Sequence, residues 1–199
     1  MKRALYVVIA VCVVMLLAGC AQVEVAIRVD SNASIPAARL AISTSEYTIF
    51  NQLKRAAVDE YQKLSPEERQ HVQIQTKEDG APYIVAWVWN FPDQEAAQEF
   101  TRRFLGSTAQ LTKEQDLIIL QAQLRGSEME GVINQLGAAA TVRPFLHNIN
   151  LTIKAYMPGE ILSFVDGAID QDVWFLDLNL GQVYQQKPTF DVEVISRGG

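Results

Sequence analysis

Cysteine, histidine and carboxylate side chains are the groups in this sequence that could carry out nucleophilic, metal-dependent or acid–base chemistry. There are two cysteines, Cys12 and Cys20, and two histidines, His71 and His147. Neither histidine has a partner at the spacing of a metal site, so we expect both to be structural or surface residues. No phosphate-binding glycine loop, nucleophile elbow or zinc-protease motif occurs in the sequence. The sequence therefore predicts no metal and no other cofactor.

Two acidic pairs have the right side chains for general acid–base catalysis. Glu67 and Glu68 follow Ser65-Pro66 at a predicted helix start, where carboxylates are favourable near the positive end of the helix dipole. Glu128 and Glu130 flank a weaker helix start. We predict that neither pair is catalytic and that the protein is not an enzyme, with an unrecognised hydrolase as the least favoured alternative.

Cys20 has the most specific surroundings of these residues. Lys2 and Arg3 precede an apolar run of 15 residues, 4–18. A membrane-spanning helix needs about 20 apolar residues, whereas the hydrophobic region of a signal peptide has about 7–15. The run ends at Leu17-Ala18-Gly19-Cys20, which resembles a bacterial lipobox. In precursors of that class the cysteine thiol receives a diacylglyceryl group, and the chain is then cleaved just before the cysteine.

This resemblance predicts a lipoprotein signal peptide over residues 1–19 and a single envelope-exposed domain over residues 20–199, with Cys20 as the lipid attachment residue. The alternatives are an ordinary signal peptide that contains a cysteine, or an uncleaved short anchor. Cleavage would remove Cys12 and lipidation would use Cys20. The exported domain would then have no thiol for a disulfide or a metal.

The composition limits the partners of the processed chain. Removal of 19 residues from the 199 leaves 180, enough for one domain with a sizeable core. The loss of Lys2 and Arg3 takes the net charge from −6 to −8, which disfavours nucleic acid and electrostatic adhesion to anionic lipid. We therefore expect the chain to reach the membrane through the lipid on Cys20. The predicted location is the cell membrane or outer membrane, facing away from the cytoplasm.

Hydrophobic periodicity predicts an α+β fold, with a largely antiparallel sheet and two main helices packed on it. The first main helix is expected to start at a Ser43–Glu46 capping box and to end near Leu64. The second is expected to have Asp93 as its N-cap and Gly106 as its C-cap. A short helix is expected over residues 127–137. The predicted strands cover residues 23–29, 39–43, 72–76, 83–91, 117–124, 148–156, 173–180 and 190–195.

The aromatic strand at residues 83–91 leaves two interpretations open. It is apolar on both faces, which predicts an interior strand covered on both sides. Tyr83, Trp87, Trp89 and Phe91 share one face and either belong to the core or line an apolar groove for a lipid or acyl chain. A similar stripe begins at Trp174, and the sequence does not decide between a core and a cavity.

The segment YMPGEILSFVDGAIDQDVWFLDL, residues 156–178, resembles part of the LppM-like bacterial lipoproteins. The shared features are Pro158-Gly159, a link with Gly167 and Asp170, and a strand with Trp174. FPDQEAAQEF, residues 91–100, also resembles the strand-to-helix step of that family. The resemblance covers most of residues 20–195. It implies an envelope-facing domain that interacts with lipid, and it implies no catalytic residues.

These observations predict a lipid-anchored, non-enzymatic domain of the cell envelope that binds a lipid, a glycolipid or a partner protein. The alternative is a structural or assembly lipoprotein with no small ligand. An apolar cavity lined by the tryptophans would favour the first function. A solid core with an exposed apolar patch would favour the second.

Overall fold

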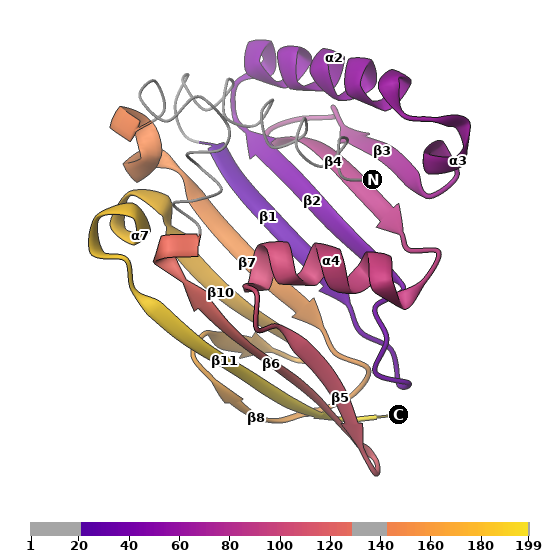
Figure 1. The fold of residues 1–199 in the computed structure, drawn as a ribbon. Helices are drawn as coiled ribbons and strands as arrows, with labels where there is room; N and C mark the ends of the chain where they lie inside the picture. Colours follow the sequence, from indigo (N-terminus) through magenta and orange to yellow (C-terminus); the bar gives the residue numbers. More distant parts are fainter. Residues whose placement is uncertain (1–20, 129–142, 199) are drawn as a thin grey trace.

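The structure, a computed structural model, describes residues 21–128 and 143–198. These residues form two β-sheets with helices packed on them (Figure 1). No helix in the described part of the chain is both long enough and apolar enough to cross a membrane. The predicted signal peptide and Cys20 lie outside the described residues.

The larger sheet has seven strands, all antiparallel to their neighbours except for one pair. In spatial order they are β3 (Val72–Lys77), β4 (Tyr83–Asn90), β2 (Ala37–Thr44), β1 (Ala21–Arg28), β7 (Asn150–Tyr156), β10 (Val173–Asn179) and β9 (Ala168–Asp170). The exception is β1 with β7, which run parallel in the middle of the sheet. A parallel pair needs a long connection, and here more than half of the chain lies between its two strands.

The smaller sheet is antiparallel throughout. Its four strands, in spatial order, are β5 (Gln110–Glu114), β6 (Leu117–Arg125), β11 (Thr189–Arg197) and β8 (Ile161–Val165). The predicted α+β class with mainly antiparallel pairing is confirmed. The sequence patterns did not separate two sheets, and they missed the short strands β5, β8 and β9.

Two long helices and three short ones lie completely within the described part of the chain. They are α2 (Tyr47–Lys63), α3 (Pro66–Arg69), α4 (Gln94–Leu105), α7 (Leu180–Gln186) and the 3-10 helix η2 (Arg143–Asn148). The predicted caps of α4 are confirmed, because the Asp93 side chain accepts a hydrogen bond from the Ala96 amide at 2.8 Å and Gly106 follows the last turn. Most of the helix expected over residues 127–137 lies outside the described residues.

The capping box predicted at Ser43 and Glu46 is wrong. Strand β2 continues to Thr44, and α2 begins after Glu46, whose side chain makes no capping hydrogen bond. Ser43 pairs with Gln22 of β1 on one side and Ile84 of β4 on the other. Ladder hydrogen bonds to both neighbours hold this part of the chain extended, so the local helix-start signal is overridden.

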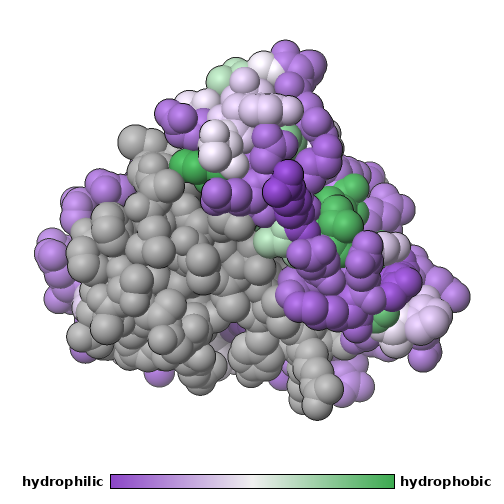
Figure 2. Space-filling model, turned by 90° about the horizontal axis from the view of Figure 1, so that it is seen from above, coloured by the Kyte–Doolittle hydropathy of each residue, from purple (hydrophilic) through white to green (hydrophobic). Residues whose placement is uncertain are grey.

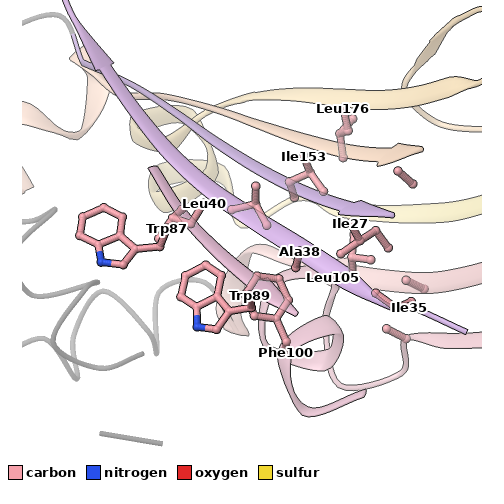
Figure 3. Packing of buried hydrophobic residues seen from close by; sticks show 14 of the residues in the cluster. Ile27, Ile35, Ala38, Leu40, Trp87, Trp89, Phe100, Leu105, Ile153 and Leu176 are labelled. Atoms are coloured by element: carbon pink, nitrogen blue, oxygen red, sulfur yellow. The ribbon is translucent and has the colours of Figure 1, made fainter. Parts of the chain in front are cut away.

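The core lies between one face of the larger sheet, helices α2 and α4, and the inner face of the smaller sheet. Trp87 is 2% exposed and Trp174 is 0% exposed. Figure 3 shows Trp89 beside Phe100 of α4, and the centroids of these two rings are 5.2 Å apart. Strand β4 is an interior strand, as expected. On its second face, however, Ile84 and Val88 are half-exposed, so the expected cover on both faces is incomplete.

Candidate functional site

Cys20, the predicted lipid attachment residue, immediately precedes the first described residue. Strand β1 starts at Ala21, so no linker separates the predicted attachment point from the sheet. Ala21 pairs with Thr44 at the end of β2. A lipid on Cys20 would therefore hold this end of the sheet directly at the membrane.

The backbone carbonyls of both histidines accept hydrogen bonds at the ends of elements. The carbonyl of His71 accepts a hydrogen bond from the Asn90 amide at 2.8 Å, which extends the β3–β4 ladder by one residue. The carbonyl of the exposed His147 accepts one from Asn179 Nδ2, also at 2.8 Å. Within residues 21–128 and 143–198, no group of three or more His, Cys, Asp or Glu side chains could hold a metal ion.

One member of each acidic pair, Glu68 and Glu128, accepts local hydrogen bonds. Glu68 forms a capping box with Ser65, in which the Glu68 carboxylate accepts from the Ser65 amide and the Ser65 hydroxyl accepts from the Glu68 amide. Glu128 accepts from the Ser107 hydroxyl at 2.8 Å and from the Ser107 amide at 3.2 Å. Its predicted companion Glu130 lies outside the described residues.

Both tryptophan stripes lie on the same face of the larger sheet. Residue pairing places Trp87 beside Leu40 on β2, and Trp174 beside Ala155 on β7. All four residues are buried in the core. The structure therefore assigns these stripes to the core, and the groove interpretation receives no support from them.

A hollow of about 700 Å³ lies at the far end of β1, where the chain turns into β2. Its walls come from β1, β2, β4 and the segment that follows β7. Ala26 and Ala37 contribute small side chains to it, while Arg28, Arg39 and Tyr156 contribute large polar ones. The volume is within the range of about 300–1,000 Å³ that is common for ligand sites.

Asp30 gives the hollow a fixed negative charge. Its Oδ1 accepts hydrogen bonds from the backbone amides of Asn32 and Ser34, both at 2.9 Å, and its Oδ2 accepts one from the Ser34 hydroxyl at 2.7 Å. Burial raises the pKa of Asp30, but the hydrogen bonds from Ser34 and Asn32 outweigh it and hold that pKa below its ordinary value. Lys113 of β5 also donates to the Ser31 carbonyl at 2.7 Å. The Asp30 carboxylate therefore favours its ionised form, and both of its oxygens are occupied by hydrogen bonds from the turn.

A row of charges crosses the outer face of the larger sheet next to the hollow. One carboxylate oxygen of Glu24 on β1 accepts a hydrogen bond from the Arg39 guanidinium of β2 at 2.6 Å. The other carboxylate oxygen lies 2.7 Å from the Lys154 Nζ of β7. The hydrogen bond to Glu24 raises the pKa of Lys154. Arg39 is therefore neutralised by Glu24, while Arg28 forms no ion pair within the described part of the chain.

The hollow is lined by hydrogen-bonding and charged groups. Arg28 offers a guanidinium, the exposed Tyr156 offers an aromatic ring and a hydroxyl, and Asp172 offers a second carboxylate. Its lining residues in the described part of the chain include no cysteine, no histidine and no group of side chains that could hold a metal ion. This arrangement suits the binding of a polar molecule in an open hollow.

The sequence analysis missed the residues of the hollow. Arg28, Arg39 and Tyr156 lie within the predicted strands 23–29, 39–43 and 148–156, and nothing in their spacing indicates a shared site. The sequence signal that could have indicated the hollow is alanine at positions 26 and 37. In the alternating pattern of these strands, both positions face away from the core, where a long polar side chain is expected. Small residues between large polar ones leave space on a sheet face, but the position of that space depends on strand register.

A second unusual feature is an apolar cluster at the edges of the two sheets. Leu162, Phe164 and Val165 of β8 and Ile169 of β9 are 41–47% exposed. Strand β8 is the last strand of the smaller sheet and β9 the last of the larger. Figure 2 shows a contrasting surface, on which the described residues are mainly hydrophilic and the hydrophobic ones form small separate groups.

Comparison with known proteins gives one structural likeness. The chain matches no family model and no curated protein sequence. Among solved structures it is similar to the NMR structure of the folded domain of Mycobacterium tuberculosis LppM, with 10% identity, 90% of each chain covered and a TM-score of 0.48. That protein carries the name of the lipoprotein family that residues 156–178 resemble. We infer no function from a likeness of this size.

Proposed function

We propose that this protein is a non-enzymatic domain of the cell envelope, anchored by lipid on Cys20, that binds a ligand in the hollow beside Arg28 and Tyr156. The ligand class is a lipid or glycolipid through its polar part, or a partner protein. The hollow is the observation that carries the binding function, because it combines volume, an aromatic ring and a cation, Arg28, that makes no ion pair with another described residue.

The lipobox pattern supports the anchor. Leu17-Ala18-Gly19-Cys20 follows a charged start and a 15-residue apolar run, and β1 begins immediately after it. The location that follows is the cell membrane or outer membrane, with the domain outside the cytoplasm. Two or more acyl chains on one residue are sufficient for stable attachment.

The electrostatics of the hollow support binding over catalysis. A general acid needs a raised carboxyl pKa, whereas the pKa of Asp30 is lowered. Both Asp30 oxygens also accept hydrogen bonds from the turn, which leaves this carboxylate poorly placed to exchange a proton with a substrate.

The exposed apolar cluster on β8 and β9 supports a second function, that of a structural or assembly lipoprotein. Leu162, Phe164 and Val165 lie on an edge strand that has no charged residue and no proline. Natural edge strands usually carry such residues to prevent strand pairing with other chains. A partner protein would cover this cluster without any ligand in the hollow.

The anchor is tested by Cys20→Ser in the full chain. The variant keeps the charged start and the apolar run, so its export should begin, but it lacks the thiol that accepts the diacylglyceryl group. We expect a larger precursor that incorporates no labelled palmitate. Equal labelling of the variant and the wild type would refute the lipoprotein function.

The hollow is tested by native mass spectrometry of the lipidated protein purified from membranes. We expect a bound ligand that is lost from Ala37→Trp, in which the indole fills the hollow, and retained by Gln75→Trp on β3 of the same sheet face. Absence of any bound small molecule, together with a co-purifying protein that is lost from Phe164→Glu, would instead establish the assembly function.

A further inference from the structure

The end of the larger sheet that carries Tyr47 and Tyr83 is, we propose, a membrane-contacting surface. It lies against the headgroup region of the bilayer that holds the acyl chains of Cys20, and the hollow faces away from that bilayer. This orientation rests on the lipid attachment in the proposed function, and it adds a second contact that the lipid alone does not provide.

Strand register places the two tyrosines beside the attachment point. Ala21 pairs with Thr44, and Thr44 pairs with Tyr83. Neighbouring strands are about 4.8 Å apart, so the Tyr83 backbone lies about 10 Å from that of Ala21 and at the same level along the strands. Tyr47 begins α2 three residues after Thr44, and its ring centroid is 5.2 Å from that of Tyr83.

Because β1 starts one residue after Cys20, the two tyrosines are close enough to the bilayer to contact it. Ala21 is one residue from Cys20, and consecutive Cα atoms are about 3.8 Å apart. With acyl chains in the hydrocarbon core, Ala21 is held in the interfacial layer, which is about 5–8 Å thick on each side of the bilayer. Side chains about 10 Å away at the same level therefore reach that layer or its boundary with water.

The chemistry of this end fits an interfacial layer. Tyr47 is 51% exposed although its ring stacks on that of Phe50, which is fully buried. A tyrosine places an apolar ring and a polar hydroxyl at the headgroup level, which is why this residue is enriched there. Of the charges near this end, Lys54, one turn after Phe50, is paired with Glu78 at 2.5 Å. Glu46, directly before Tyr47, is exposed and keeps its charge in the hydrated headgroup layer.

The opposite end of the sheet holds the hollow and the exposed apolar cluster. Strand β1 extends from Ala21 to Arg28, about 23 Å at 3.3 Å per residue. Ile169 of β9 pairs with Trp174, near the end of the sheet that contains Tyr156 and Arg28. The hollow and the β8–β9 cluster are thus at the end remote from the attachment point, open to the envelope space.

Single-cysteine labelling of the processed lipoprotein tests this orientation. The thiol of Cys20 is blocked by lipid and Cys12 is removed, so one introduced cysteine is the only reactive thiol. Ser45→Cys places a fluorophore at an exposed position two residues before Tyr47, and Asn32→Cys places the matched control in the exposed β1–β2 turn. Each labelled protein is reconstituted into phosphatidylcholine vesicles that carry a nitroxide on the headgroup.

We expect quenching at position 45 to exceed that at position 32 at least about five-fold, because roughly 23 Å of sheet separates the two ends. Adding Tyr47→Ser to the Ser45→Cys protein should reduce the quenching at position 45 about two-fold or more, since it removes the aromatic contact. Equal quenching at both positions, stronger quenching at position 32, or no effect of Tyr47→Ser would overturn the proposal.

Flotation of the vesicles separates this proposal from the anchor on which it rests. A protein that carries no lipid mass and does not float refutes the attachment at Cys20. A protein that carries the lipid and floats, but is quenched mainly at position 32, leaves the attachment intact and refutes only the orientation.

Discussion

Replacement of Trp87 by alanine is the most direct test of how the core is assembled. Trp87 is 2% exposed and lies on β4, between Leu40 of β2 and Ile74 of β3. Removing an indole from a core that cannot collapse costs the transfer energy of the lost atoms and the energy of the cavity, about 3–5 kcal/mol in total. In a domain of this size each kcal/mol lowers Tm by about 2–4 °C, so the expected decrease is about 6–20 °C.

The assay is urea denaturation of the lipid-free domain, followed by far-UV circular dichroism because the variant loses a fluorophore. Val88→Ala is the matched control, since Val88 is the next residue along β4 but is half-exposed on the opposite face. We expect the control to lose about 1 kcal/mol or less. A loss under about 1 kcal/mol for Trp87→Ala itself would mean that β4 is not an interior strand and would refute this packing.

Three further predictions test single contacts by the same denaturation assay. Lys154→Met should cost up to about 1 kcal/mol near neutral pH, since the pair with Glu24 is partly exposed. Because the pKa of Lys154 is raised above 10.5, the difference in stability between the wild type and the variant should be fully present below pH 10.5 and should vanish as the pH rises through the raised pKa. A difference in stability that persists in alkali would contradict the role of the Lys154–Glu24 pair. Gly106→Ala should lower the free energy of unfolding more than Gly80→Ala does. Both glycines have a positive φ, and the backbone strain of alanine there is about 1–3 kcal/mol, but of the two only Gly106 would place a Cβ against a backbone oxygen, at 2.4 Å. Equal losses of stability in the two variants would exclude this clash. Asp93→Ala should cost about 1 kcal/mol through the lost N-cap of α4, and no loss would show that the cap is not stabilising.

Elements with strong local signals were predicted well from the sequence. Strand β4 was recognised from its aromatic and β-branched residues, and α4 from its cap at Asp93 and its glycine at the other end. Such signals depend on residues within one or two turns of each other, so no tertiary information is needed. The capping box at Ser43 failed for the complementary reason, because ladder pairing with β1 and β4 decides the conformation there.

The sequence predicts site residues only from linear patterns. The predicted lipobox at Cys20 is such a pattern, because it consists of four consecutive residues that follow an apolar run. The hollow has no such pattern. Arg28 and Tyr156 lie far apart in the sequence and come together because β1 and β7 pair in parallel with Arg28 beside Tyr156.

The sequence by itself determined the α+β class, most helices and strands, the predicted attachment residue and the absence of recognisable catalytic motifs. The tertiary structure alone decided that the strands divide between two sheets, and that the stripes of Trp87 and Trp174 share one buried face. It also decided that the hollow opens at the end of β1 away from Ala21. The physical reason is that periodicity and capping are short-range properties, whereas strand order, register and the spaces left between side chains depend on contacts between residues that are distant in the chain.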